Sequence, residues 1–404
     1  MNLSLYIAKR YLISKKSHHV INIISWISVI GIGVGTLALI VVLSAFNGLQ
    51  TLVEDLYASF DPDIKITALT GKTFNINDFP KQEIANRKDV LYCSESIEEV
   101  ALFKYNDKQT VATLKGVDPV FYNMTGLDSM VYEGQVKADD ELNNYLCIGY
   151  GIADNLSIYM SNKFMDKISV IVPKKGTQKS FLPTDEFSRK YADASGVFSI
   201  SPDFDTKYVL SSLEFARALL KHPNRVTSVE LQLRPSVNPK KVKQEIQALV
   251  GKNFVVKTRF ELNELVFKTN ETEKWITFLI LAFILIIASF NIVGSLTMLI
   301  IDKKKDIWIL KTMGASNTLI QKIFFTEGML INLLGAFSGM FLGALICWLQ
   351  QTYGLLRLHG GIVDFYPVEL QFIDFIYVTG TVIVIGLLAS WYPARILTKR
   401  HLSK

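Results

Sequence analysis

Four long apolar segments constrain this sequence more than any other feature. Residues 20–46, 275–301 and 375–394 contain no Lys, Arg, Asp or Glu, and residues 323–350 contain only Glu327. At about 1.5 Å per helical residue, each segment can cross a hydrocarbon core of about 30 Å. The first is too long for the apolar part of a signal peptide, and no small-residue cleavage site follows it. We therefore predict a multi-pass α-helical membrane protein with four transmembrane helices.

A polar region, residues 47–274, separates the first apolar segment from the second, and no part of it is long and apolar enough to span a membrane. The chain of 404 residues is 50% hydrophobic yet 20% charged, a mixture typical of a membrane protein with a large aqueous domain. This region is large enough for a core of its own. The net charge of +6 is modest, and no basic face with interleaved aromatic residues indicates nucleic acid.

The two ends of the polar region share a pattern of short strands beside one helix, which predicts an α+β domain with two subdomains. The expected strands are 63–69, 111–117, 228–233 and 254–258, and the expected helices are 79–87 and 238–250. The two ends would pack together, and residues 119–225 would form an insertion. Within it, strands are expected at 167–172 and 196–200, joined by a polar connector, residues 173–190.

The distribution of Lys and Arg predicts the topology. Residues 1–19, which we expect to form an interfacial helix, the loop 302–322 and the tail 395–404 are rich in Lys and Arg, whereas the loop 351–374 has one Arg and no Lys. By the positive-inside rule, both termini are cytoplasmic and residues 47–274 are external. A charged, cysteine-poor external domain favours a bacterial inner membrane with this domain in the periplasm.

The cytoplasmic loop between the second and third apolar segments carries an amphipathic pattern. Ile307, Leu310 and Met313 recur at every third position, as in a helix, and Gly314 can end that helix in a left-handed conformation. Three lysines precede them, and each would cost about 2.5–3.5 kcal/mol at the bilayer centre. We expect a short helix at the membrane surface whose apolar side faces something other than the adjoining spans. It is either the contact for a separate ATPase or a basic loop that serves only as a topology signal.

No catalytic or cofactor site is expected in this chain. Residues 71–73 (GKT) resemble the end of a phosphate-binding loop, but Ile66 stands where that loop needs glycine. The histidines show no metal-ligand spacing, and no nucleophile or zinc-protease motif occurs. Of the three cysteines, Cys93 and Cys147 are the only conceivable pair, although free, buried thiols are the preferred interpretation, and Cys347 lies in an apolar segment.

Polar and small residues within the apolar segments each allow two interpretations. Asn291 either lines a substrate cavity or forms a hydrogen bond between helices. Glu327 either relays ions or pairs with a basic neighbour such as Lys322. Three glycines repeat at every fourth position of the third segment and predict close helix packing: Gly335, Gly339 and Gly343.

Four parts of the chain resemble the ABC-transporter permeases that include the macrolide exporter MacB and the cell-division protein FtsX, and most closely the lipoprotein-releasing permeases LolC and LolE. The matching segments are 7–11 (IAKRY) with 24–35 (ISWISVIGIGVG), 39–49 (LIVVLSAFNGL) and 61–66 (DPDIKI), then 303–316 (KKKDIWILKTMGAS), 325–343 (FTEGMLINLLGAFSGMFLG) and 389–395 (ASWYPAR). This resemblance implies a MacB-like periplasmic core between the first and second spans.

The resemblance also implies partners. Two permease chains, identical or related, pair with each other and with two copies of a cytoplasmic ATPase, which binds the ATP and Mg²⁺. Lipoproteins enter from the outer leaflet of the inner membrane and pass to a periplasmic chaperone. No cofactor is implied for this chain itself.

Particular residues are implied for each contact. The ATPase would be engaged by residues of the loop: Asp306, Ile307, Leu310, Lys311, Met313 and Gly314. The substrate cavity would be lined by the first and second spans: Ile32, Val42, Phe46 and Asn291. The chaperone would contact the connector: Lys174, Phe181 and Pro183.

Two other functions fit the same architecture. One is export of small molecules or peptides, as in MacB, where the ATPase usually precedes the first span in the same chain. The other is signalling as in FtsX, in which the permease relays the state of the ATPase to a periplasmic partner and transports nothing.

Overall fold

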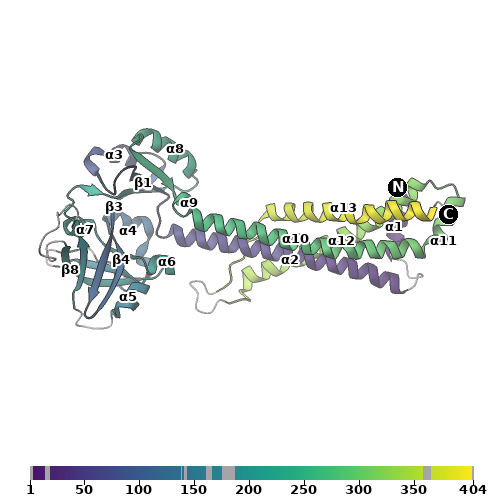
Figure 1. The fold of residues 1–404 in the computed structure, drawn as a ribbon, viewed down its shortest axis with the longest axis horizontal. Coiled ribbons are helices and arrows are strands. Elements are labelled where there is room, and N and C mark those ends of the chain that lie inside the picture. The colour runs from purple at the N-terminus through teal and green to yellow at the C-terminus, as the bar shows by residue number, and fades with distance from the viewer. Residues whose placement is uncertain are drawn as a thin grey trace. The chain divides into compact units, whose positions relative to one another are not determined.

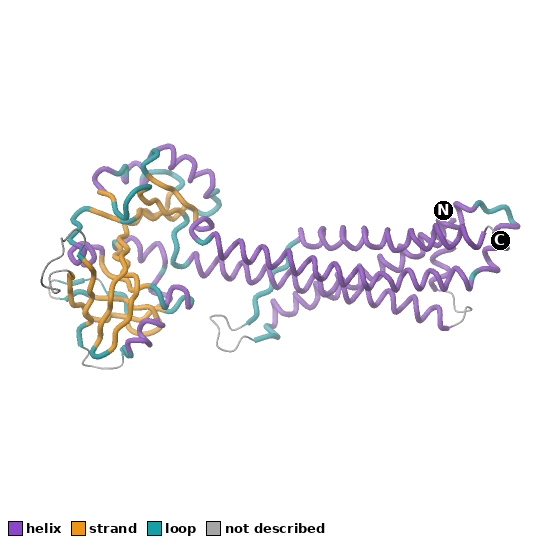
Figure 2. The backbone as a smooth tube through the Cα atoms, viewed as in Figure 1, coloured by secondary structure: helices purple, strands orange, loops and turns teal. Residues whose placement is uncertain are grey.

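The computed structural model describes residues 3–13, 19–137, 139–140, 143–160, 166–174, 187–357 and 365–402. The chain forms two compact units. Met1–Leu52 and Val266–Lys404 form the first, here called the helical bundle, and Val53–Leu265 form the second, here called the sheet unit. Figure 2 shows that helices make up almost all of the bundle, whereas strands dominate the sheet unit.

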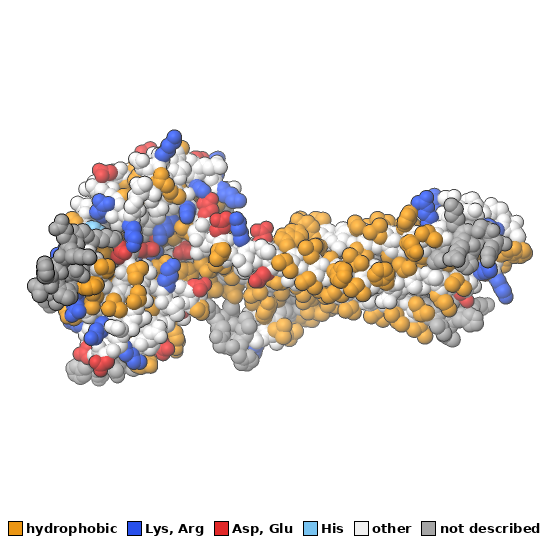
Figure 3. Space-filling model, in the orientation of Figure 1, with side chains coloured by type: hydrophobic (Ala, Val, Ile, Leu, Met, Phe, Trp, Pro, Cys, Tyr) orange, Lys and Arg blue, Asp and Glu red, His pale blue; other side chains and the backbone are white. Residues whose placement is uncertain are grey.

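Four long helices run side by side in the bundle (Figure 1). The helices of this part of the chain are α1 (Leu3–Ile13), α2 (His19–Ala58), α10 (Glu264–Asp302), α11 (Lys304–Thr312), α12 (Asn317–Tyr353) and α13 (Phe372–Leu402). Among the described residues, α2, α10, α12 and α13 are long and apolar enough to cross a membrane. Hydrophobic side chains cover most of the visible face of the bundle (Figure 3). The predicted fold class is confirmed.

The helices are longer than the apolar segments. α2 continues past residue 46 to Ala58, and α10 begins at Glu264 instead of residue 275. α12 begins at Asn317 instead of residue 323, because the Ser316 hydroxyl accepts a hydrogen bond of 3.3 Å from the Leu319 amide and caps the helix. Polar residues with good helix propensity extend a helix beyond the bilayer, where water can satisfy its end groups.

Short strands and helices build the sheet unit. Its strands are β1 (Ile64–Ala68), β2 (Phe74–Asn75), β3 (Val90–Tyr105), β4 (Lys108–Val117), β5 (Val131–Gly134), β6 (Tyr145–Gly149), β7 (Ile168–Pro173), β8 (Phe187–Phe198), β9 (Tyr208–Ser212), β10 (Arg225–Val226), β11 (Ser228–Leu233) and β12 (Phe254–Thr258). Its α-helices are α3 (Lys81–Ala85), α4 (Pro119–Thr125), α5 (Tyr150–Leu156), α6 (Pro202–Asp205), α7 (Leu213–Leu220), α8 (Pro239–Val250) and α9 (Arg259–Leu262), with 3₁₀ turns at Ile76–Asp78 and Leu127–Met130.

Ten of these strands form one continuous sheet. The order is β12-β1-β11-β3-β4-β9-β6-β8-β5, and β7 pairs with β3 and β8. The pairs β4–β9 and β6–β8 are parallel, and the other pairs in this sheet are antiparallel. Strands from both ends of the region, β1, β11 and β12, lie side by side, as the sequence pattern suggests.

Two hydrophobic cores lie along this sheet. One joins the ends of the region, from Ile64 to Cys93 and from Val226 to Val256. The other extends from Ile97 to Leu219. The second core therefore begins within β3, earlier than the insertion predicted at 119–225. The reason is that β3 is a long strand that leaves the first core and continues into the second.

The structure corrects one local prediction and agrees with the preferred interpretation of the cysteines. The strand expected at 196–200 is the end of β8, which starts at Phe187, so the connector that follows β7 ends before residue 190. β8 pairs on both sides, with β7 and β6. Cys93, Cys147 and Cys347 are free and buried.

Candidate functional site

The loop between the second and third apolar segments folds into α11, a helix with a defined end. The amide of Met313 donates to the Ile309 carbonyl at 3.1 Å, and the amide of Ala315 donates to the Leu310 carbonyl at 2.9 Å. Gly314 follows at φ +90°, in the left-handed region that glycine adopts without a steric cost. The ends of α1 and α13 lie at the same end of the bundle as α11 (Figure 1).

One side of α11 packs against the adjoining helices. Ile307 is buried in a cluster with Leu299, Ile300, Ile320, Phe324 and Ala394. The expectation that the whole apolar stripe faces away from the spans is therefore wrong for Ile307. At 100° per residue, positions 307, 310 and 313 lie at 0°, 300° and 240° around a helix, so a three-residue repeat turns away from its first member. Leu310 is accordingly half-buried, and Met313 is exposed.

The exposed side of α11 carries three large apolar side chains beside Lys305 and Thr312. These are Trp308, Ile309 and Met313, which are 67%, 50% and 78% exposed. Sequence periodicity missed Trp308 and Ile309, because only an observed burial pattern shows which side of a short helix is covered. We call Trp308, Ile309 and Met313 the α11 face.

Of the charged residues of α11, Lys304 and Lys305 are exposed, whereas Asp306 and Lys311 are half-buried. Asp306 is half-buried beside Tyr11 of α1, and burial, together with the carboxylates of Asp306 and Glu327, raises the pKa of Tyr11 to about 12. Lys303 lies over the same ring, with its Nζ 5.7 Å from the centroid. Asp306 thus faces Tyr11 of α1. Lys311 is half-buried, in the last turn of the helix.

The predicted cavity residues do not meet in one place within this chain. Ile32 is buried, and a Cβ on Gly335 would lie only 2.9 Å from its Cβ, so Ile32 packs on α12. Val42 and Phe46 are half-buried, whereas Asn291 is exposed on α10. Its amide nitrogen lies 3.8 Å from where a Cβ on Gly31 would be, which brings α10 beside α2.

The glycine repeat of α12 faces α2. A Cβ on Gly339 would lie 2.2 Å from the carbonyl oxygen of Gly33, and one on Gly343 would lie 3.0 Å from the Cβ of Ile40. With Gly335 against Ile32, all three glycines lie on this contact. Small residues let two helix backbones approach closely, which is how helices associate inside a membrane.

A polar cluster at one end of the bundle was missed from the sequence. The Asn47 amide donates to Asp374 Oδ2 at 2.5 Å and to the Glu369 carbonyl at 3.2 Å, and Lys274 donates to Asn47 Oδ1 at 2.6 Å. This polar cluster joins α2, α10 and α13. A signal existed, because Asn47, Lys274 and Asp374 each lie immediately outside a charge-free segment.

The sheet unit holds a buried group of four charges. Strand register pairs Lys65 of β1 with Glu230 of β11, and Glu98 of β3 with Lys115 of β4. Lys115 Nζ lies 3.0 Å from Glu230 Oε2, and Lys65 Nζ lies 2.7 Å from Glu98 Oε1. Lys115 and Glu230 are almost fully buried, and Lys115 also lies over the Phe121 ring at 4.6 Å. Two positive and two negative charges thus neutralise one another.

The pKa values of this charge group follow from its pairing. Burial favours the neutral carboxyl of Glu98, but Lys65 and Lys115 outweigh it and lower the pKa of Glu98 to about 2. Burial likewise opposes ionisation of Glu230, and the same two lysines bring the pKa of its carboxyl below the ordinary value. Burial opposes the charge on Lys65, yet Glu98 and Glu230 raise the pKa of its ammonium well above its usual range.

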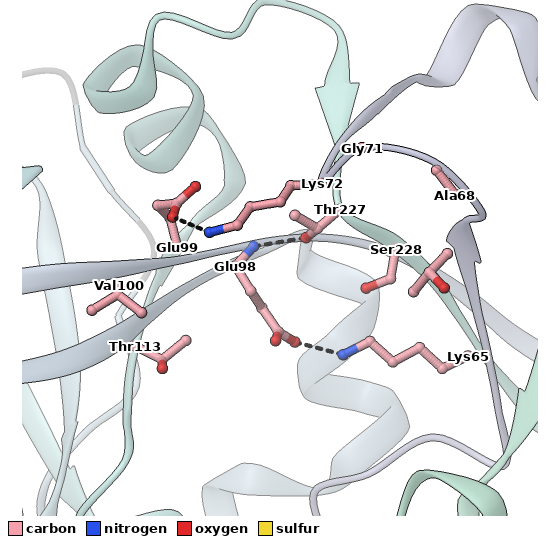
Figure 4. A pocket seen from close by; sticks show the side chains of 11 residues that line it. Lys65, Ala68, Gly71, Lys72, Glu98, Glu99, Val100, Thr113, Thr227 and Ser228 are labelled. Carbon is pink, nitrogen blue, oxygen red and sulfur yellow. Dashed lines mark hydrogen bonds and ion pairs between the residues drawn. The ribbon is translucent and has the colours of Figure 1, made fainter. Parts of the chain in front are cut away.

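A cavity of about 360 Å³ opens beside these charges (Figure 4). The ion pairs Lys65–Glu98 and Lys72–Glu99 cross it, and the Glu98 amide donates to the Thr227 hydroxyl at 2.7 Å. Lys72 of the GKT triplet is thus paired with a carboxylate. The charges that line the cavity are paired with one another, so the geometry indicates a structural joint between strands.

The connector expected to contact a chaperone is described only at its two ends. Lys174 follows β7 and lines a cavity of about 250 Å³ with Ser188 and Leu220. Phe181 and Pro183 lie outside the described residues.

Comparison with known proteins assigns the chain to a protein family and finds relatives of nearly the same length. The family described as MacB-like periplasmic core domain matches residues 25–249, more than half of the chain, and the family described as FtsX-like permease C-terminal matches residues 278–402. The lipoprotein-releasing system transmembrane protein LolE of Haemophilus influenzae is 25% identical over 98% of this chain and 96% of its own length. LolC of Neisseria meningitidis serogroup B is 24% identical, over 98% and 97%.

Solved structures give a weaker likeness. The periplasmic region of MacB from Actinobacillus actinomycetemcomitans is 12% identical, with a TM-score of 0.37, and covers 54% of this chain and 97% of that one. The resemblance of the sequence to these permeases is confirmed by the family matches and by the relatives that align over nearly the full chain.

Proposed function

The chain belongs to the family with the MacB-like periplasmic core domain, and we propose that it is the membrane subunit of an ABC transporter that releases lipoproteins from the inner membrane. One observation carries the proposal: relatives named as lipoprotein-releasing transmembrane proteins align with almost the whole chain, including both of its units. The resemblance is therefore not confined to a shared transmembrane region.

Release of a lipoprotein from the membrane requires a partner that supplies free energy. Extracting one acyl chain from the bilayer costs about 0.8 kcal/mol per CH₂ group, so release of a lipid-anchored protein needs an input of free energy. We propose that a separate cytoplasmic ATPase binds the ATP and Mg²⁺ and supplies this energy. No nucleotide site is assigned to this chain.

The α11 face is the proposed contact for that ATPase. Trp308, Ile309 and Met313 are exposed, whereas Ile307 on the other side packs with residues of α10, α12 and α13. A displacement of α11 would therefore be passed to three spanning helices through a packed cluster. This arrangement supports mechanical coupling better than a role as a topology signal alone, because such a signal needs only the lysines.

Orientation and the remaining partners are part of the same proposal. Both termini and α11 face the cytoplasm, and the sheet unit is periplasmic. A second permease chain, identical or related, completes the transport path, to which the first and second spans contribute. A periplasmic chaperone receives the lipoprotein, with the connector after β7 as the proposed contact.

The test is the fate of lipoproteins when this protein is depleted from its cell. We expect lipoproteins destined for the outer membrane to accumulate in the inner membrane, as measured by fractionation and immunoblotting. Outer-membrane proteins without a lipid anchor serve as the control and should fractionate normally. Unchanged lipoprotein fractionation would contradict the proposal and would favour signalling or export of another substrate.

A further inference from the structure

A cavity of about 310 Å³ opens among α2, α10 and α13 at one end of the helical bundle. Its apolar wall consists of Leu43, Trp275, Phe278, Ile373 and Tyr377. The Trp275 ring lies roughly edge-on to those of Phe278 and Tyr377, with centroids 5.8 Å apart in each pair. Trp and Tyr gather at membrane–water interfaces, so the wall has the composition of an interfacial site.

The polar wall lies on the water side of the same cavity. It contains Glu271, Lys274 and Asp374, together with Gln50. Lys274 directly precedes the charge-free segment 275–301, and Asp374 directly precedes the segment 375–394. The cavity is therefore amphipathic, with charged groups at the boundary of the spans and rings within them.

Asp374 lines this cavity, and one of its carboxylate oxygens has an ion-pair partner but no hydrogen bond. The residue is only 2% exposed, and its Oδ2 accepts the hydrogen bond from Asn47. Its Oδ1 lies 3.5 Å from Lys274 Nζ and has no hydrogen-bond partner among the described residues. A buried acceptor without a hydrogen bond is costly. A ligand that brings an N–H donor would satisfy it.

The charges of the cavity favour a cationic group. When ionised, Glu271 and Asp374 contribute two negative charges and Lys274 contributes one positive charge. The Lys274 ammonium has three N–H donors, and one of them donates to Asn47. It therefore retains a donor for an anionic group. The complementary ligand carries an ammonium and a phosphate a short distance apart, attached to an apolar body.

We propose that this cavity binds the headgroup of a zwitterionic phospholipid with a primary ammonium. The ammonium donates to Asp374 Oδ1 and faces Glu271, the phosphate accepts from Lys274, and the first part of the lipid tail lies on Trp275 and Phe278. A primary ammonium fits better than a quaternary one, because only the former can donate a hydrogen bond to Asp374. The volume is at the lower end of small-molecule sites and suits a headgroup instead of a whole lipid.

The test uses the purified full-length chain in detergent, without any lipoprotein present. It is mixed with equal amounts of phosphatidylethanolamine, phosphatidylcholine and phosphatidylglycerol with identical acyl chains, and the retained lipids are measured by native mass spectrometry. We expect phosphatidylethanolamine to be retained preferentially. Asp374→Asn should reduce that preference about tenfold, because a hydrogen bond to a charged group is replaced by a neutral one.

A matched pair of variants keeps the test decisive if Asp374→Asn does not fold. Glu271 lines the cavity, whereas Glu273, an equally exposed glutamate two residues further on, does not. Glu271→Gln should weaken the preference, and Glu273→Gln should leave it unchanged. Equal retention of the three lipids, or the same loss in both glutamate variants, would overturn the proposal. Because no cargo is present, this result does not depend on whether the chain releases lipoproteins.

Discussion

At the scale of single residues, the most consequential feature is the buried pair Lys115–Glu230. Its ammonium and carboxylate lie 3.0 Å apart, and Ser96 donates a further hydrogen bond of 2.8 Å to Glu230. Such a pair adds little net stability compared with well-packed apolar residues, but removing one partner leaves an uncompensated charge. We therefore expect the pair to restrict how β11 and β4 align on their shared neighbour β3 more than it strengthens the fold.

Lys115→Met tests this interpretation. We expect it to lower the free energy of unfolding of the sheet unit by about 3–5 kcal/mol, measured as the denaturant concentration at which residues 53–265 become protease-sensitive in the full-length chain. Lys72→Met is the control, since the Lys72 side chain is 68% exposed and its pair with Glu99 should contribute about 0–1 kcal/mol. Adding Glu230→Gln to Lys115→Met should recover part of the loss, and failure to do so would count against the uncompensated charge as its cause.

At the scale of elements, the contact between α2 and α12 depends on glycine. Gly339 and Gly343 of α12 meet Gly33 and Ile40 of α2 without room for an added methyl group at Gly339. This close approach joins two of the spanning helices. α11 in turn is joined to the bundle by Ile307, so its motion cannot be independent of the helices on either side.

Gly339→Ala should therefore destabilise the bundle, by about 1–3 kcal/mol as for overpacking in a core. The measurement is the thermal unfolding midpoint of the purified chain in detergent. Gly294→Ala and Gly380→Ala are matched controls, because they lie in spanning helices and a Cβ there meets nothing within 4 Å. A decrease of equal size in all three variants would show that helix packing at Gly339 is not the cause.

Met313→Asp tests the α11 face. Met313 is 78% exposed, so the substitution should leave insertion and folding intact while it removes apolar contact and places a charge in the interface. We expect the ATPase to be lost from the chain on co-purification, whereas Met313→Leu should retain it. Retention of the ATPase with the Asp variant would exclude Met313 from the contact. Leu310→Asp is a less clean test because Leu310 is half-buried.

At the scale of the whole molecule, the two units differ in the environment that each requires. The bundle exposes large apolar side chains along α10 and α12, whereas the sheet unit buries its own two cores. The bundle is therefore stable only in a bilayer or in detergent, and the sheet unit suits water. The proposed orientation places them in the inner membrane and the periplasm.

Cysteine labelling can test that orientation. The three native cysteines are buried, so their background reaction with a membrane-impermeant maleimide should be low. In intact cells with a permeabilised outer membrane, Lys88→Cys in the sheet unit should react and Lys305→Cys in α11 should not. After the inner membrane is lysed, both should react. The opposite pattern would reverse the topology.

Much of the architecture was predictable because its causes are local. A charge-free segment long enough to cross the bilayer and a glycine after α11 act through neighbouring residues. The contacts that the sequence analysis missed or predicted wrongly share a different cause. Nothing near position 307 says that Ile307 is covered by Phe324 and Ala394, and nothing near position 374 says that Asn47 lies beside it.

The amino-acid sequence was sufficient to predict the four spans, their order, the place of the large domain and the family. These depend on the transfer free energy of runs of residues and on segments that resemble known permeases. The folded structure was needed to show which face of α11 is free, how β3 passes from one core to the other, and which polar residues meet at Asp374. The physical reason is that burial and hydrogen bonding join residues hundreds of positions apart, and the spacing of residues along the chain carries no record of those contacts.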